Sequence, residues 1–323
     1  MRNGGDSEGV PAVPRVRHFD ASTLEEARCW QAQCKRGLAV GLGVSEFLEQ
    51  RAAEGAAGEP AAPLNAEITF TKDIGHSNFF KMTFEVTPQW KAEALMTVPK
   101  KTGGRFPAVL CVQGVKEDIY PQTEFCVWPY REKRISEGWQ PYAHCLAERG
   151  YVTISAGFQY PPPGVTGREM SNGAERVMIG IRLLDYLCER DDVDAGSIGA
   201  IGICRWGGVA CHMAAFDARI SALVCTAMLA RDQQGVPWPF AGANQPPFDL
   251  PDLCSLTAPL PVLYQFGEND PLRPLYPTDA EMEEVKRRHV ICGGRRDDIE
   301  ILWHPGRHAV DPGSPPDFFD RTM

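Results

Sequence analysis

The chain has 323 residues, of which 43% are apolar and 23% are charged, as in an ordinary globular protein. Its 33 Lys and Arg against 42 Asp and Glu give a formal net charge of −9, which offers no general electrostatic reason to bind nucleic acid or an anionic membrane surface. The apolar stretches fall far short of the roughly 18–20 residues that span a bilayer, and residues 1–17 lack the apolar core of a signal peptide, so we expect a cytoplasmic protein that acts on a small molecule.

Residues 1–63 are predicted to form a disordered lead and a helical arm. The lead, residues 1–17, is rich in Gly and Pro. A helix is expected to begin at Ser22, which stands three residues before an acid, and to end at about Lys35. A second helix is expected over about 44–53, followed by a linker of small residues. The arm packs either on its own domain or on a neighbouring copy, so a homo-oligomer remains open.

Residues 64–323 carry the pattern of one large α/β domain. Three short runs that alternate apolar and polar residues predict half-buried antiparallel strands at 68–71, 81–86 and 92–98. Continuous apolar runs then alternate with helical stretches, which predicts a mostly parallel central sheet with helices on both faces. The expected buried strands are 106–112, 151–156, 198–203, 220–226, 260–266 and 299–303, and the expected helices are 142–149, 174–190, 207–216 and 279–289. A small lid is expected over about 227–258.

The residue after the strand 198–203 is the candidate nucleophile. Cys204 stands in the run Gly202-Ile203-Cys204-Arg205-Trp206-Gly207, and a helix is expected to follow at once. A strand, a sharp turn and a helix are the setting of a nucleophile elbow, in which the turn holds one side chain above the sheet. The helix N-terminus beneath it favours an anion, and therefore a thiolate over a thiol.

Two later strand ends supply an acid and a histidine. Asp270 follows the strand 260–266, and His308 lies on a Gly-containing loop beyond the strand 299–303. His304 is the other histidine there, and we expect it to be structural. Nucleophile, acid and histidine after successive strands is the chain order of the α/β-hydrolase arrangement, which makes Cys204, Asp270 and His308 the predicted catalytic triad.

The oxyanion hole is expected beside the elbow. In this architecture the loop after the strand 106–112 supplies one backbone N–H, and the residue after the nucleophile supplies the other. These donors are Val115, or its neighbour Gly114, together with Arg205. Gln113 and Trp206 complete the predicted substrate-binding residues.

From about residue 60 to the end, the sequence resembles α/β-hydrolase-fold esterases. It is most similar to the acetylxylan esterase and dienelactone hydrolase-like groups, and the N-terminal arm resembles the helical lead of some of these esterases. Because dienelactone hydrolases use cysteine with Asp and His, the resemblance implies Cys204 as nucleophile, His308 as base and Asp270 as acid. The segments that carry it are 92–99, 106–114, 142–155, 183–204, 214–220, 266–271 and 306–308.

The sequence also departs from these families. Trp206 stands where the elbow has glycine, and the resulting order of nucleophile, Arg, any residue and Gly is similar to the elbow of glucuronoyl esterases. That likeness implies that the Arg205 side chain helps to hold the oxyanion. The oxyanion loop begins with Gln113 in place of His, and most relatives with a long N-terminal region have Ser where this chain has Cys204.

Nothing in the sequence indicates a metal or an organic cofactor. The 11 cysteines include no CxxC pair, no Cys/His spacing resembles a zinc site, and we expect most of the cysteines to be small buried residues. The remaining histidines are expected to be structural or to lie at the surface: His18, His76, His144, His212 and His289.

The sequence thus favours a hydrolase that cleaves an ester, a lactone or a thioester through a Cys-His-Asp triad and an acyl-enzyme. Two alternatives remain open. One is a non-hydrolytic enzyme on the same fold that transfers or cyclises an acyl group. The other is a catalytically silent binding protein, which the unusual Gln113 and Trp206 favour.

Overall fold

The fold is described from a computed structural model that covers residues 18–56, 63–100, 103–112, 142–156, 173–230 and 249–323. The helices are α1 Leu24–Leu42, α2 Ser45–Ala56, α5 Tyr142–Arg149, α6 Ala174–Glu189, α7 Arg205–Phe216, α8 Leu250–Thr257, α9 Asp279–Ile291 and α10 Ser314–Thr322. The strands are β1 Glu67–Asp73, β2 Ser77–Thr87, β3 Trp90–Pro99, β4 Phe106–Val112, β5 Val152–Ala156, β6 Val193–Ile203, β7 Ile220–Thr226, β8 Val262–Gly267 and β9 Ile299–His304. Two short 3₁₀ turns are η2 Arg273–Leu275 and η3 Arg296–Asp298.

The described strands form one sheet in the order β1-β2-β3-β5-β4-β6-β7-β8-β9. The first three strands pair antiparallel, and β3 pairs antiparallel with β5. From β5 to β9 every pairing is parallel. This confirms the predicted mostly parallel sheet with antiparallel strands leading into it.

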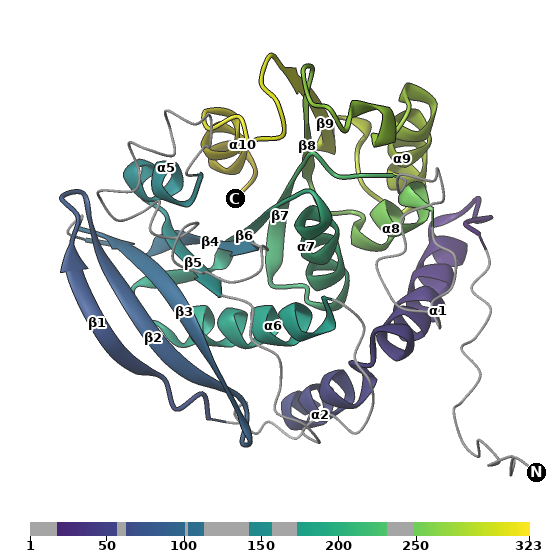
Figure 1. Cartoon of the computed structure of the whole chain (residues 1–323). Helices are drawn as coiled ribbons and strands as arrows, with labels where there is room; N and C mark the ends of the chain where they lie inside the picture. Colours follow the sequence, from purple (N-terminus) through teal and green to yellow (C-terminus); the bar gives the residue numbers. More distant parts are fainter. Residues whose placement is uncertain (1–17, 57–62, 101–102, 113–141, 157–172, 231–248) are drawn as a thin grey trace, which may run out of the picture.

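The central strands are buried on both faces, as their continuous apolar runs predict. In β4, Ala108 and Leu110 belong to one hydrophobic cluster, whereas Val109 and Cys111 belong to the other. Helices α6 and α7 pack over the first cluster, while α5 and α10 cover the opposite face, so the sheet lies between two helical layers (Figure 1).

The first helix of the N-terminal arm begins at Leu24, two residues later than predicted. Thr23 caps α1 in a capping box with Glu26, while Ser22 adds a hydrogen bond to the same carboxylate. The prediction that this helix ends at about Lys35 is wrong. Its buried face continues through Leu38 to Leu42, and the helix ends only at Gly43, whose positive φ of 79° suits a glycine cap.

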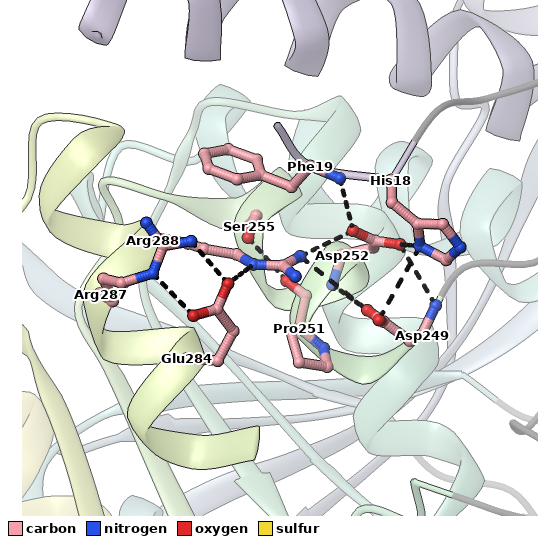
Figure 2. Close-up of polar contacts among 9 residues, drawn as sticks. All are labelled: His18, Phe19, Asp249, Pro251, Asp252, Ser255, Glu284, Arg287 and Arg288. Atoms are coloured by element: carbon pink, nitrogen blue, oxygen red, sulfur yellow. Dashed lines mark hydrogen bonds and ion pairs between the residues drawn. The ribbon is translucent and has the colours of Figure 1, made fainter. Parts of the chain in front are cut away.

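The arm packs on the rest of its own chain. Figure 2 shows His18 and the backbone N–H of Phe19 bonded to the buried Asp252 carboxylate, which also forms an ion pair with Arg288 at 2.7 Å. Gln31 on α1 donates to two backbone oxygens at the end of α8. These contacts anchor α1 to α8 and α9.

Other differences from the sequence prediction lie at element ends. Strand β6 begins at Val193, five residues before the predicted start at 198. Residues Leu250–Thr257 of the predicted lid form the buried helix α8, and residues 231–248 of that lid lie outside the described residues. Helix α10 was not predicted. The boundary between residues 63 and 64 stays a prediction. In the described part of the chain, no helix is long and apolar enough to cross a membrane.

Candidate active site

Cys204 stands at a sharp bend between β6 and α7. Its φ of 59° and ψ of −130° lie in a region that non-glycine residues seldom adopt, which is the strain expected of a nucleophile elbow. The Cys204 N–H donates to the Thr226 oxygen at 2.7 Å, and its oxygen accepts from Gly207 N–H at 3.1 Å. Backbone bonds on both sides therefore hold the bend.

Glycines on either side make the bend possible. A Cβ at Gly202 would lie 2.3 Å from the backbone oxygen of Trp206, too close for any other residue. A Cβ at Gly207 would lie 3.3 Å from the Gly202 oxygen. The sequence positions of the two glycines thus follow from the close approach of strand and helix at Cys204.

The elbow brings helix dipole and backbone donors to one place. Cys204 is the N-cap of α7, and Arg205 is its first helical residue. The positive end of the helix dipole lies at this N-terminus and favours an anion there. Val112 at the end of β4 pairs with Gly202, so the predicted oxyanion loop begins next to this elbow. Gln113, Gly114 and Val115 themselves lie outside the described residues.

Asp270 and His308 lie on two loops that are joined by hydrogen bonds. At the ends of the parallel strands β8 and β9, Gly267 pairs with His304. The Glu268 N–H donates to the His304 oxygen at 2.9 Å, and Asn269 N–H donates to a loop oxygen at 3.1 Å. The loops approach so closely that a Cβ on Gly267 would lie 2.1 Å from a backbone oxygen of the histidine loop.

The three predicted triad residues meet. His308 Nδ1 lies 2.6 Å from Asp270 Oδ2, and the Asp270 side chain is fully buried, whereas His308 is 31% exposed. The Cys204 side chain lies close enough to the same imidazole to raise its pKa. The histidine therefore lies between a carboxylate and a sulfur, the arrangement in which it holds or moves a proton.

This environment favours the imidazolium form of His308. Burial by itself would lower the pKa of His308, but the hydrogen bonds and charges of Cys204 and Asp270 raise it to about 9. Burial likewise acts to raise the pKa of Asp270, and hydrogen bonds outweigh it and hold that pKa below its usual value. At neutral pH the pair is an imidazolium backed by a carboxylate.

Sequence reasoning missed one residue of the site, Tyr276. Its hydroxyl donates to Asp270 Oδ2, the oxygen that also faces His308, while the Leu272 N–H donates to Asp270 Oδ1 at 2.8 Å. Burial, then the hydrogen bond and charge of Asp270 and the charge of Cys204, raise the pKa of Tyr276 well above its usual value. Only its place six residues after Asp270 marks it in the sequence.

Trp206 lies against a buried ion pair. The Arg176 guanidinium stacks 3.6 Å from the Trp206 ring centroid and bonds the Glu175 carboxylate at 2.5 Å. Both charged side chains are nearly inaccessible, 6% and 2% exposed. The tryptophan that replaces the usual elbow glycine thus packs on a cation at the start of α6.

The other cysteines differ from Cys204 in their surroundings. Six of the ten described cysteines are buried, and burial raises the pKa of Cys34 to about 12 and that of Cys292 to about 11. Cys29 is exposed, and Cys204 is half-buried. Buried thiols of this kind stay protonated at neutral pH and react slowly.

His304 has the structural place that we expected for it. It is 7% exposed, and its Nδ1 accepts a hydrogen bond from the Gly306 N–H at 3.1 Å, which shapes the loop that carries His308. His212 is buried inside the domain, and burial lowers its pKa to about 3.

Several solved structures with the same architecture are esterases. A glucuronoyl esterase from Solibacter usitatus matches with a TM-score of 0.65 at 18% identity, over 82% of this chain and 88% of that one. A protein from Bacteroides fragilis, described as a putative acetyl xylan esterase, matches with a TM-score of 0.63 at 15% identity. The match covers 90% of this chain and 78% of that one. A glucuronoyl esterase from Teredinibacter turnerae matches with a TM-score of 0.62 at 16% identity, over 96% of this chain and 87% of that one. With the sheet order above, these matches show that the chain has the α/β-hydrolase fold.

Sequence comparison finds only partial relatives. A stretch of 90 residues is 34% identical to an uncharacterized protein of Pseudomonas aeruginosa, and one of 83 residues is 37% identical to the uncharacterized protein YcjY of Escherichia coli. These stretches cover 27% and 25% of this chain, and 24% and 27% of the two relatives. No family model matches the chain.

Proposed function

We propose that the chain is a carboxylic ester hydrolase in which Cys204, His308 and Asp270 form the catalytic triad. The observation that carries the proposal is a strained, strand-end thiol beside an imidazole whose Nδ1 lies 2.6 Å from a buried carboxylate and whose pKa the thiol group helps to raise. The fold it shares with glucuronoyl and acetyl xylan esterases supports the same reaction class.

The reaction begins with attack by the sulfur. The Cys204 thiolate adds to the carbonyl carbon, and the carbonyl oxygen becomes an oxyanion. As the intermediate collapses, the carbon–oxygen bond of an ester or lactone breaks, or the carbon–sulfur bond of a thioester. His308 gives its proton to the departing group, and a thioester acyl-enzyme remains.

Water completes the cycle. Neutral His308 takes a proton from a water molecule, whose oxygen attacks the thioester carbon. The carbon–sulfur bond then breaks, the carboxylic acid leaves, and the thiolate with its imidazolium partner is restored. Asp270 keeps the Nδ1 proton of His308 in place, so that the opposite ring nitrogen faces the reaction.

The oxyanion is held at the start of α7. The Arg205 backbone N–H is one donor, and the loop residue Val115 or Gly114 is the proposed second. Each such donor typically contributes about 2.7–4 kcal/mol to the transition state. The Arg205 side chain, like the elbow arginine of glucuronoyl esterases that the sequence resembles, adds positive charge.

The sulfur narrows the substrate class. A thiolate is a better leaving group than an alkoxide, so the tetrahedral adduct of an alkyl ester tends to expel the sulfur again. Substrates with a readily departing group avoid this return. We therefore propose an enol lactone, an activated ester or a thioester, as in the dienelactone hydrolase-like enzymes that the sequence resembles.

The proposal is tested by hydrolysis of phenyl esters, an enol lactone and an acyl thioester. Cys204→Ala should lower kcat/KM by at least about 10³-fold, because the nucleophile is gone. Cys29→Ser, at an exposed cysteine outside the site, is the matched control and should keep the parent rate. Hydrolysis that survives Cys204→Ala unchanged would overturn the proposed mechanism.

Products from reactions in H₂¹⁸O separate hydrolysis from acyl transfer. A hydrolase places one ¹⁸O atom in the released acid. An acyl-transfer or cyclising enzyme forms products without ¹⁸O, and a silent binding protein forms none. Either of the last two results would contradict the proposed hydrolysis.

A further inference from the structure

Two histidines and a glutamate converge far from the candidate active site. His76 lies in the turn between β1 and β2, and His144 and Glu148 lie one turn apart on α5, beside that turn in Figure 1. One ligand atom from each lies within 4.8 Å of the other two. We infer that this cluster, which we call the hairpin–α5 site, binds a zinc ion.

The two imidazoles are arranged as they are around one metal ion. Their ring centroids are 4.8 Å apart, and the ring planes are inclined by 73°. Two imidazoles bound to one tetrahedral zinc at about 2.0–2.1 Å have ring centroids about 5 Å apart. His144 Nε2 lies 3.0 Å from Glu148 Oε1, and neighbouring zinc ligands are separated by about 3.4 Å.

Neighbouring groups orient the ligands. His76 Nδ1 hydrogen-bonds the hydroxyl of the buried Ser77 at 2.7 Å, and we assign Nε2 as the nitrogen that would bind the metal. Such a bond to the second ring nitrogen accompanies nearly every zinc-bound histidine. The His144 side chain is almost fully buried, 5% exposed, whereas the Glu148 side chain is 44% exposed and has room to turn its carboxylate toward an ion.

The charges around the site allow a cation. Two basic residues on the adjoining segments, Lys100 and Arg149, are already paired with carboxylates. Lys100 bonds Asp73 in the same turn, and Arg149 bonds Asp320 at 2.6 Å. Among the described residues, the ligands are two imidazoles, which bind a metal in the neutral form, and one carboxylate, a donor set that suits zinc and other transition ions better than Mg²⁺ or Ca²⁺.

The site lies at the opposite end of the strands from Cys204. Ser77 pairs with Pro99 at the end of β3, which runs antiparallel to β5, so this end of the sheet is where the parallel strands begin. Cys204 follows the end of β6. A zinc ion here therefore joins the β1–β2 hairpin to α5 and stabilises the fold without touching the ester chemistry.

The test uses the full-length chain with Cys204→Ala, so that zinc cannot bind the triad sulfur. After treatment with a chelator, the protein is titrated with Zn²⁺ against a chromogenic competitor. We expect one equivalent to bind. Zinc at about a hundredfold over its Kd should raise Tm by about 4 °C. Mg²⁺ should produce no such rise.

Three variants on that background locate the ion. His144→Ala removes a buried ligand, and Glu148→Gln removes an exposed one without disturbing the core. Each should weaken zinc binding by at least about tenfold and reduce the Tm rise. His18→Ala is the matched control, because His18 belongs to another cluster of a histidine and two carboxylates, and it should bind zinc as the parent does. If His144→Ala and Glu148→Gln bind zinc as tightly as the parent and the His18→Ala control do, the inference is overturned.

Co²⁺ in place of zinc gives an independent readout. A site of two imidazoles and one carboxylate shows visible d–d absorption without a thiolate charge-transfer band. A thiolate band would mean that cysteines bind the metal, and the inference would be wrong. Loss of esterase activity plays no part in this test, so its outcome is independent of the proposed catalytic function.

Discussion

Replacing Asp270 with asparagine tests whether the carboxylate sets the charge of His308. The substitution keeps the shape of the side chain and removes the charge that lies 2.6 Å from His308 Nδ1. In the folded chain the pKa of His308 is raised to about 9 from its usual 6.5, and after the opposing effect of burial the causes are Cys204 first and Asp270 second. An opposite charge at this distance typically moves a pKa by about 1–3, so Asp270→Asn should lower the pKa of His308 to about 7.5.

The change is large enough to measure directly. At pH 8, a pKa of about 9 leaves roughly ten imidazolium rings for each neutral ring. A pKa of about 7.5 leaves roughly one imidazolium ring for every three neutral rings. NMR titration of the protein with carbon-13-labelled histidine rings would measure the pKa of His308. The His308 signal is assigned by its loss in His308→Gln. We also expect kcat to fall by about 10³–10⁴-fold, because the ring loses its preferred tautomer. An unchanged pKa in Asp270→Asn would refute the electrostatic account.

Three further predictions follow from the same contacts. Tyr276→Phe removes a hydrogen-bond donor to the triad carboxylate and should lower kcat by about tenfold. The acidic limb of the pH–rate profile should also move to higher pH. An unchanged profile would mean that the tyrosine is only a packing residue. Gly267→Ala forces a Cβ to within 2.1 Å of the Arg307 oxygen and should lower both Tm and kcat, whereas Gly313→Ala, where a Cβ meets nothing within 4 Å, should change neither. Because the folded pKa of His308 is raised, its stabilising effect is complete below pH 6.5 and is lost as pH rises through 9. Urea unfolding at both pH values should show the wild type losing about 1–2 kcal/mol more than His308→Gln, a figure reduced because the ring is 31% exposed.

The sequence predicted the sheet, and the strand ends that carry the proposed triad residues, because both depend on local patterns. The apolar runs 106–112 and 220–226 coincide with β4 and β7, since a strand buried on both faces has no polar positions within it. The elbow was recognisable because Gly202 and Gly207 are needed for the close approach of strand and helix at Cys204. Strand ends in a parallel sheet lie along one edge, so residues after successive strands had to meet there.

What the sequence did not reveal depends on contacts or on weak patterns. Helix α10 has only nine residues and two prolines in its first turn, so its start resembles a loop, although proline in a first turn is itself a signal of a helix start. Helix α8 has only eight residues, all of them buried, and the capping box of Asp249 and Asp252 marks its start. Tyr276 reaches the site through the turn after β8, which no spacing rule describes.

The hairpin–α5 site illustrates the same limit. His144 and Glu148 are one helical turn apart, but the third member, His76, comes from a distant hairpin. Zinc sites recognisable from sequence have closely spaced ligands within short motifs. A site assembled from a hairpin turn and a helix becomes visible only when the fold is known.

The central claim is that His308 activates the sulfur of Cys204, and alkylation by iodoacetamide tests it most directly. Labelling at pH 7 is followed by mass spectrometry of individual peptides, with the exposed Cys29 as internal reference. We predict that Cys204 reacts at least about ten times faster than Cys29, and that His308→Gln removes the difference. A rate at Cys204 no greater than that at Cys29, or one that His308→Gln leaves unchanged, would contradict the account.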